Sequence, residues 1–223
     1  TEIISYSIIS KEFLQQTGIK ENEAVELANP LTEEWQFMRP SLLISLASVI
    51  GQNQNLKSNI KLFEIAKIYL PSSSSSRRVK LDKPSMTWRT RGSDTDLPKQ
   101  DLQASIVLWP AQFSDIKGIV ENLFEILQRE PKFSKPDNTP GVSWALFEKS
   151  QSAQIKIGDK IVGTLGFLNE STTEYFGIDG QVAVAELNLS TIYQLPATQL
   201  SYKPIPKYPP VIEDISAIFD EKT

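Results

Sequence analysis

The residues of this sequence that could do acid–base chemistry are carboxylates, lysines, tyrosines and arginines, because it contains no histidine and no cysteine. The absence of histidine removes the commonest general base, the usual partner of a nucleophilic serine and a frequent metal ligand. The absence of cysteine removes disulfides, thiolate nucleophiles and zinc sites built on sulfur. The chain therefore has few routes to catalysis.

Two of the carboxylates, Glu64 and Glu186, stand in the middle of predicted strands among apolar residues. An unpaired carboxylate in such a position costs several kcal/mol, so each needs a partner, for which Arg39 or a lysine is the candidate. A buried structural ion pair is favoured over a catalytic acid at both positions, although both interpretations stay open.

The sequence also lacks a phosphate-binding loop. Its ten glycines are dispersed, and no G-x-x-x-x-G-K or G-x-G-x-x-G motif occurs. Gly163 and Gly166 fall inside a predicted hairpin, where glycine more often permits close backbone packing than ligand binding. The formal net charge of -4 gives no overall attraction for nucleic acid.

The elements that would position these residues follow from periodicity. Helices are predicted over 40–54 and 114–127, where apolar residues recur at i, i+3 and i+4, and Ser10 and Ser190 are predicted to cap two short helices. Apolar and alternating runs of residues indicate strands, and Gly158-Asp159 indicates a hairpin turn between two of them. The predicted strands cover 2–9, 61–70, 86–89, 104–109, 144–148, 154–168 as a hairpin, 181–189 and a last strand near the carboxyl end.

Hairpins without βαβ alternation indicate an α+β domain, built on a mainly antiparallel sheet flanked by helices. We expect the 61–70 strand to be buried on both sides and central in the sheet. Residues 1–200 are predicted to form this core, and residues 71–102 an exposed loop. The loop contains five consecutive serines and a basic cluster diluted by aspartates, so solvation is favoured over a partner contact.

The ends of the sequence suggest a piece of a longer protein, because it begins without Met and stops directly after a predicted strand. No apolar run approaches the roughly 18 to 20 residues that span a bilayer, and no signal peptide is recognisable. A cytoplasmic protein without a membrane segment is expected.

Several motifs occur together in a particular order. They are NPLTEEWQFMRPSLL at 29–43, KLFEIAKIYL at 61–70, FSDIKGIVENLF at 113–124, and then the strands KIVGTLGFL and VAVAELNL. This series resembles the core of the bacterial phenylalanyl-tRNA synthetase β subunit. The final stretch, 201–223, resembles a linker leading into the first strand of that family's ferredoxin-like anticodon-binding domain.

The resemblance implies a class II synthetase-like core whose active site belongs to the partner α subunit of an α2β2 enzyme. That enzyme would use ATP and Mg and would act on tRNA(Phe). The arginine that ends the motif 2 strand of active class II enzymes would fall at Leu70, and no arginine follows Arg129 to serve motif 3. Lysine would not restore the forked contact of arginine. We therefore predict no catalytic, cofactor-binding or metal-binding residue in this chain.

The residues singled out are instead structural or interfacial. Arg39 and Glu64 are predicted either to pair with each other or, for Arg39, to reach the α subunit. Leu42 and Leu46 belong to the 40–54 helix, the better candidate for a subunit interface. The family that the motifs resemble usually has a histidine near the end of the Gly-x-x-Gly strand, and this chain has Asn169 nearby. Two alternatives remain, a stand-alone protein-interaction domain and a self-contained ATP-dependent ligase.

Overall fold

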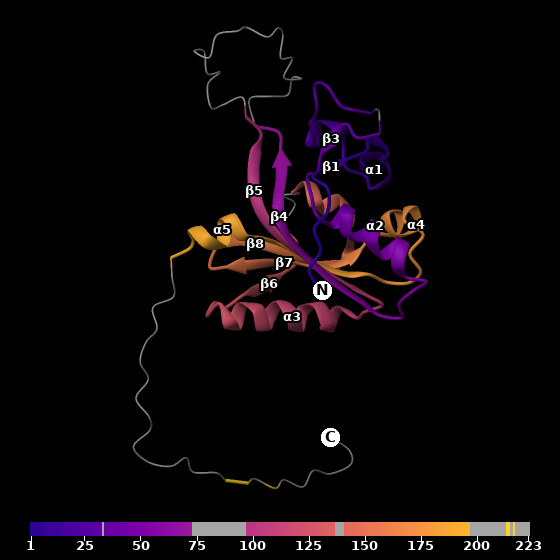
Figure 1. The fold of residues 1–223 in the computed structure, drawn as a ribbon. Helices are drawn as coiled ribbons and strands as arrows, with labels where there is room; N and C mark the ends of the chain where they lie inside the picture. The colour runs from indigo at the N-terminus through magenta and orange to yellow at the C-terminus, as the bar shows by residue number, and fades with distance from the viewer. Residues whose placement is uncertain (33, 73–96, 137–140, 197–212, 215, 217–223) are drawn as a thin grey trace.

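The main sheet of the protein is a six-stranded antiparallel sheet with the order β4-β5-β9-β8-β7-β6. The computed structural model (Figure 1) describes all residues except 33, 73–96, 137–140, 197–212, 215 and 217–223. The strands are β4 Ile60–Leu70, β5 Lys99–Trp109, β6 Lys132–Ser134, β7 Phe147–Ile157, β8 Lys160–Leu168 and β9 Ala183–Asn188. The predicted α+β class, with an antiparallel sheet flanked by helices, is confirmed.

Helices cover both faces of this sheet. Helix α2 (Leu43–Asn53) packs on one face, while α3 (Phe113–Ile126) and the short α5 (Leu189–Gln194) pack on the other. The apolar stripe of α3 places Ile116, Val120 and Phe124 at 0% exposure against the sheet. The amphipathic spacing predicted this face correctly because a helix repeats every 3.6 residues.

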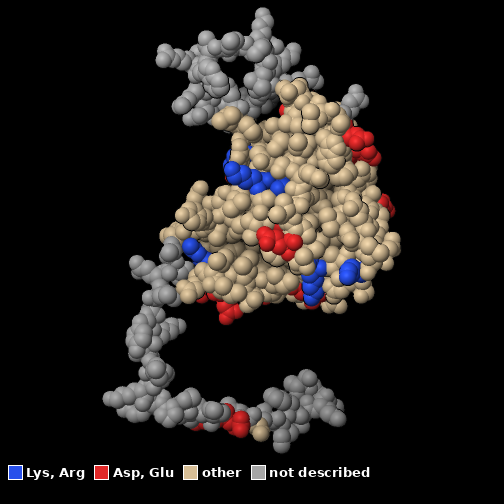
Figure 2. All heavy atoms as spheres, in the orientation of Figure 1, with Lys and Arg blue, Asp and Glu red and all other residues tan. Residues whose placement is uncertain are grey.

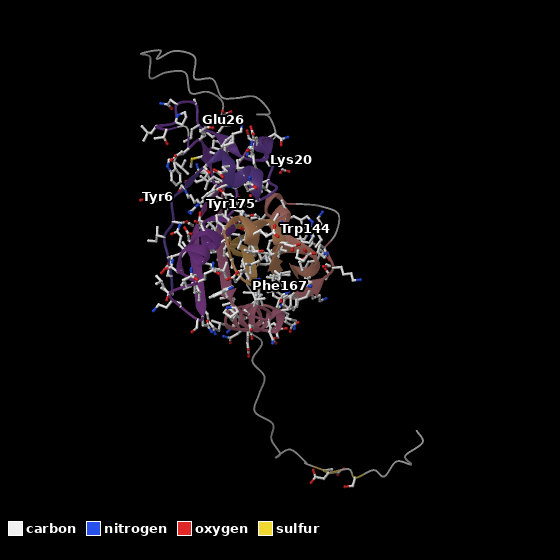
Figure 3. The ribbon with its side chains drawn as sticks, turned by 90° about the vertical axis from the view of Figure 1, so that its right-hand side faces the viewer. Tyr6, Lys20, Glu26, Trp144, Phe167 and Tyr175 are labelled. Atoms are coloured by element: carbon white, nitrogen blue, oxygen red, sulfur yellow. The ribbon has the colours of Figure 1, made fainter. Side chains whose placement is uncertain are left out.

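A small N-terminal lobe sits against α2. It contains a three-stranded sheet with the order β1-β3-β2. Its elements are β1 Ile8–Ile9, α1 Lys11–Gln16, the 3-10 helix Glu21–Glu23, β2 Val25–Glu26 and β3 Phe37–Met38. Figure 3 shows Tyr6 at the outer edge of this lobe. Leu14 and Phe37 join the same apolar core as α2, so the lobe and the main sheet fold as one body.

The chain start adds a further contact to the sheet. The Phe63 amide donates to the Thr1 carbonyl and the Ile3 amide donates to the Phe63 carbonyl, each at 3.0 Å. Residues 1–3 therefore run along the outer edge of β4, which a strand at the edge of a sheet would otherwise leave open.

The β7–β8 hairpin depends on three glycines. Gly158 has a φ of +58° at the turn, a backbone region that favours glycine. A Cβ at Gly163 would lie 2.4 Å from the Glu186 carbonyl oxygen, and one at Gly166 would lie 2.6 Å from Ser152 Cβ. The expectation that this Gly-x-x-Gly pair serves close packing is confirmed.

The position of β4 in the sheet was predicted wrongly. The strand exists as expected, but β4 is the last strand of the main sheet and not a central one. It is also not buried on both sides, since Ile65 is 48% exposed. The run of apolar residues could not reveal this, because the order of strands is set by long-range pairing.

Element boundaries differ at several places. The strand predicted over 2–9 is reduced to β1, and a 3-10 helix (Val142–Leu146) precedes β7 at the predicted 144–148 strand. Strand β5 begins at Lys99, so the predicted loop cannot extend to residue 102. The side chain that caps α5 is Asn188 and not Ser190. The predicted strands at 86–89 and near the carboxyl end lie outside the described residues.

Several short elements were not predicted. They are the 3-10 helix Glu21–Glu23, β2, β3, β6 (Lys132–Ser134) and α4 (Glu170–Tyr175). All are short, so their sequence periodicity is weak. Among the helices that the structure describes, none has the length and apolarity to cross a membrane. On the face drawn in Figure 2, charged side chains are scattered and do not gather into a basic patch.

Candidate functional site

A row of polar side chains crosses the main sheet from one edge to the other. Residues directly opposite each other in register point to the same face of a sheet. The members of this polar row, in strand order, are Glu64, Ser105, Glu186, Thr164, Gln154 and Ser134. On β4 and β9 the residues two positions away, Leu62 and Val184, pack with α2, so the polar row lies on the α2 face.

The first carboxylate of the polar row is neutralised by an arginine. Arg39 Nη1 lies 2.8 Å from Glu64 Oε1, and the two side chains are only 3% and 1% exposed. The Ser5 amide donates to Glu64 Oε1 at 3.1 Å, and the Ser5 hydroxyl donates to Oε2 at 2.7 Å. Both carboxylate oxygens are therefore satisfied, as a buried charge requires.

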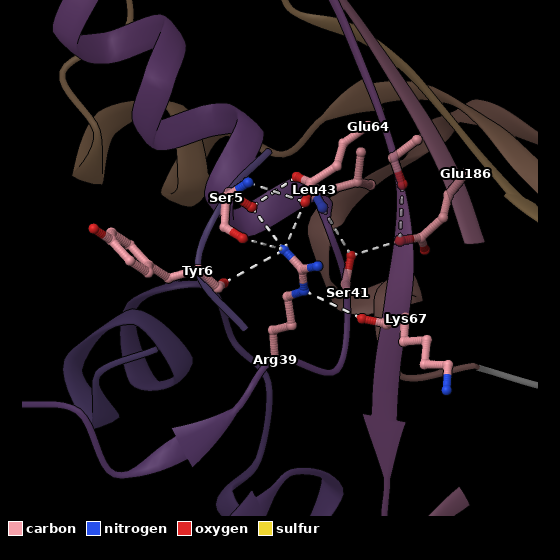
Figure 4. Close-up of polar contacts among 9 residues, drawn as sticks. Ser5, Tyr6, Arg39, Ser41, Leu43, Glu64, Lys67 and Glu186 are labelled. Atoms are coloured by element: carbon pink, nitrogen blue, oxygen red, sulfur yellow. Dashed lines mark hydrogen bonds and ion pairs between the residues drawn. The ribbon is translucent and has the colours of Figure 1, made fainter. Parts of the chain in front are cut away.

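Arg39 also makes several hydrogen bonds besides its contact with Glu64 (Figure 4). Its Nη1 donates to Ser5 Oγ at 2.7 Å, and its Nε donates to the Lys67 carbonyl at 3.2 Å. Its backbone carbonyl accepts from the Tyr69 amide at 3.0 Å. Arg39 thus links the N-terminal segment to β4, and its guanidinium is not free to bind a phosphate.

The second carboxylate of the polar row, Glu186, is held by hydroxyls. Its Oε1 accepts from Ser41 Oγ at 2.7 Å and from Ser105 Oγ at 3.3 Å. Burial raises the pKa of Glu186, and the hydroxyls of Ser143 and Ser41 oppose this only in part. The expectation that a basic residue would pair with Glu186 is wrong, because burial without a cation favours the neutral acid.

The chemistry open to this arrangement is limited. A general acid or base must reach a substrate, but Glu64 and Glu186 are at most 3% exposed and are capped by Arg39 and Ser41 of the same chain. The part of the chain that the structure describes contains one other arginine, Arg129, which donates to the Leu195 carbonyl at 3.2 Å. No group of three or more acidic residues among the described ones could hold a metal ion.

Leu42 and Leu46, the other two singled-out residues, lie in the core. Both are 0% exposed and pack with the apolar cluster between α2 and the sheet. Side chains buried within their own chain present no surface to a partner in this conformation. Of the α2 residues, Gln52 is exposed and Ser45, Ser48 and Val49 are half-buried.

Sequence reasoning missed the polar row as a unit. Its members come from six strands separated by up to 122 positions, and only the register places them side by side. The mid-strand position of Glu64 and Glu186 was the one available signal. It identified two members, but not the hydroxyl and amide side chains between and beside them.

Comparison with models of protein families shows which family the chain belongs to. Residues 1–189 match the family model described as the phenylalanyl tRNA synthetase beta chain CLM domain. The chain belongs to this family.

Individual CLM-domain relatives agree. The chain is 32% identical over 236 residues to the phenylalanine–tRNA ligase beta subunit of Fusobacterium nucleatum, and 28% identical over 227 residues to that of Clostridium acetobutylicum. These alignments cover 98% and 99% of the chain but only 26% of each relative. The chain therefore spans about a quarter of the length of the subunits that it resembles.

Solved structures support the fold of this CLM-family chain. The pyrrolysyl-tRNA synthetase of Desulfitobacterium hafniense superposes with a TM-score of 0.60, covering 86% of this chain and 62% of that enzyme. The sequence identity is 13%, so the similarity concerns the fold alone. The class II synthetase-like core predicted from the motifs is confirmed.

Asn169 has a visible structural role. It precedes α4, and its side chain accepts from the Thr172 amide at 2.9 Å. It is the N-cap of that helix, a position that favours asparagine.

Proposed function

We propose that this chain is a non-catalytic core of a phenylalanine–tRNA ligase β subunit. In this role it packs against the catalytic α subunit of an α2β2 enzyme in the cytoplasm and supports aminoacylation of tRNA(Phe). ATP and Mg are cofactors of the complete enzyme and are not expected to bind this chain. Residues 201–223 are proposed to lead into an anticodon-binding domain.

One observation carries the non-catalytic assignment. The carboxylates of the polar row are covered by Arg39 and Ser41, which belong to the same chain. A substrate would have to displace the segment that leads into α2 to reach them. Leu70, at the position proposed for the motif 2 arginine, ends β4 opposite Lys99 and carries no charge.

Calorimetric titration of ATP and of phenylalanine into the chain tests the proposal. We expect no heat of binding for either compound. The matched variant Leu70→Arg should also fail to bind ATP, because restoring one arginine leaves Arg39 and Ser41 in place. Micromolar binding of either compound to the unmodified chain would contradict the proposal and favour the self-contained ligase.

Association with a catalytic α chain tests the binding role. A complete β subunit that contains this segment should co-purify with the phenylalanyl-tRNA synthetase α chain and acylate tRNA(Phe). The same subunit with Arg39→Ala should lose association together with stability, whereas the exposed control Lys61→Ala should lose neither. No association of the unmodified subunit would favour the alternative of a stand-alone interaction domain.

A further inference from the structure

We propose that a pocket between α1, α2 and α4 binds the cationic end of an arginine or lysine side chain from a partner protein. The pocket is separate from the polar row and has a volume of about 370 Å³. Its walls come from three helices and from Phe176, the residue that follows α4. The lining residues are Phe13, Ser48, Gly51, Gln52, Tyr175 and Phe176.

Three aromatic rings form one side of the pocket. Phe13 lies 5.9 Å from Tyr175 and 5.4 Å from Phe176, measured between ring centroids, and Tyr175 lies 4.9 Å from Phe176. The interplanar angles of 77°, 84° and 69° place each ring nearly perpendicular to the others. All three rings are half-buried and line the pocket, so a bound group would meet aromatic surface.

The α2 residues that line the pocket are small or polar, and they pack closely. Gln52 Nε2 donates to Ser48 Oγ at 3.2 Å on α2. A Cβ at Gly51 would lie 2.2 Å from the Phe176 carbonyl oxygen, so only glycine allows α2 to approach Phe176 this closely. Figure 3 shows Tyr175 where the N-terminal lobe meets the core. The pocket is thus built into the junction between these two parts of the chain.

The charge at the rim favours a cation. Glu12 lies in the first turn of α1, next in sequence to the pocket residue Phe13. Burial raises the pKa of Tyr175, and the Glu12 carboxylate raises it further. Lys11, next in sequence to Glu12, is occupied by Glu21 at 3.0 Å. A carboxylate beside aromatic rings attracts a guanidinium or ammonium group and repels phosphate, so a basic protein side chain fits better than a nucleotide.

The chain already makes such a contact elsewhere. Lys117 Nζ lies 5.2 Å from the centroid of the Phe133 ring, at the surface of α3 and β6. In the pocket at α1 and α4, the lining residues include no lysine or arginine. The partner would therefore supply the cation.

Amide chemical-shift titration of the chain tests the proposal. The probe is N-acetyl-arginine methylamide, and the neutral isostere N-acetyl-citrulline methylamide and adenosine monophosphate are titrated in parallel. We expect the arginine probe to shift the amides of residues 13, 51, 175 and 176 with weak, saturable affinity. Citrulline should bind at least about threefold more weakly, in line with a surface cation–π contact.

Two variants localise the effect. Glu12→Gln, at an exposed position, and Tyr175→Leu should each weaken binding of the arginine probe about three- to fivefold. The control Tyr193→Leu removes an aromatic ring that is 91% exposed on α5, and it should change nothing.

Three outcomes would overturn the proposal. Equal shifts with citrulline would mean that the charge is irrelevant. Stronger shifts of the same amides with adenosine monophosphate would make the pocket a nucleotide-stacking site. Unchanged arginine binding in Glu12→Gln and Tyr175→Leu would place the contact elsewhere.

Discussion

At the residue scale, the two carboxylates of the polar row are stabilised in different ways. Glu64 is a charged group with a bound guanidinium, whereas Glu186 is surrounded by hydroxyls and has a raised pKa. Both are buried to a similar degree, so the difference comes from the partner and not from solvent exposure. The two sites should therefore respond oppositely to neutralising substitutions.

Removing the arginine should be costly. Arg39→Ala leaves Glu64 buried without its cation, and we expect a loss of about 3 to 5 kcal/mol in the free energy of unfolding, measured by urea denaturation. The double variant Arg39→Met with Glu64→Leu should regain more than half of this loss, since no charge then stays buried. If the double variant is less stable than Arg39→Ala, the ion pair is not what holds this region.

Neutralising Glu186 should instead stabilise the protein at neutral pH. A carboxyl whose pKa is raised on folding contributes its full stabilising free energy when the pH is below its ordinary pKa of 4.5. This stabilisation is lost as the pH rises through the raised pKa of the folded state. The free energy of unfolding should fall by at most about 1.4 kcal/mol per pH unit across that window.

The Glu186→Gln variant should lack this pH-dependent loss, because the amide does not ionise. Urea denaturation of both proteins between pH 5 and about pH 8 gives the measurement, over the range where ordinary carboxyls are already ionised. Parallel curves for the two proteins would show that folding does not raise the pKa of Glu186, and would contradict this prediction.

At the element scale, close approach of strands depends on missing side chains. Gly166→Ala places a Cβ 2.6 Å from Ser152 Cβ, and Gly163→Ala places one 2.4 Å from a backbone oxygen of β9. Each should lower the free energy of unfolding by about 1 to 3 kcal/mol, since backbone atoms in a sheet cannot move aside easily. The midpoint of denaturation measures the loss.

A third glycine is the matched control for this effect. Gly118 lies inside α3, and a Cβ there meets no atom within 4 Å. Gly118→Ala should stabilise the protein by about 0.5 to 1 kcal/mol, because alanine is the better helix former. Equal destabilisation at Gly118 and Gly166 would mean that steric contact is not the cause.

At the scale of the whole molecule, the N-terminal segment joins the small lobe to the main sheet. Residues 1–3 hydrogen-bond along β4, and Ser5 completes the Arg39–Glu64 site. The lobe also shares its apolar core with α2. The two parts should consequently unfold together.

Deleting residues 1–6 tests this coupling. Several buried polar groups lose their partners, so we expect a loss of about 3 kcal/mol or more in the free energy of unfolding. Hydrogen exchange should become faster at the Phe63 amide on β4 and at amides of the lobe. The amides of α3 should keep the same order of exchange rates. A deletion that affects only the lobe would show that the main sheet folds independently of it.

The sequence by itself determined the features that depend on neighbours along the chain. The 3.6-residue period of α3, the extended run of β4 and the Gly158 turn are local patterns, and the order of motifs identified the family. The missing histidine and cysteine limited the chemistry without any structure. For Glu64 the sequence indicated a basic partner, Arg39 or a lysine, and the structure shows that the partner is Arg39.

Only the tertiary structure decided the features that depend on pairing between distant strands. It placed β4 at the edge of the sheet, assembled the polar row and gave Glu186 hydroxyl partners from Ser41 and Ser105. It likewise brought Phe13 to Tyr175 and Phe176 across more than 160 positions. Strand order and register arise from packing the whole chain at once, so no local pattern specifies them.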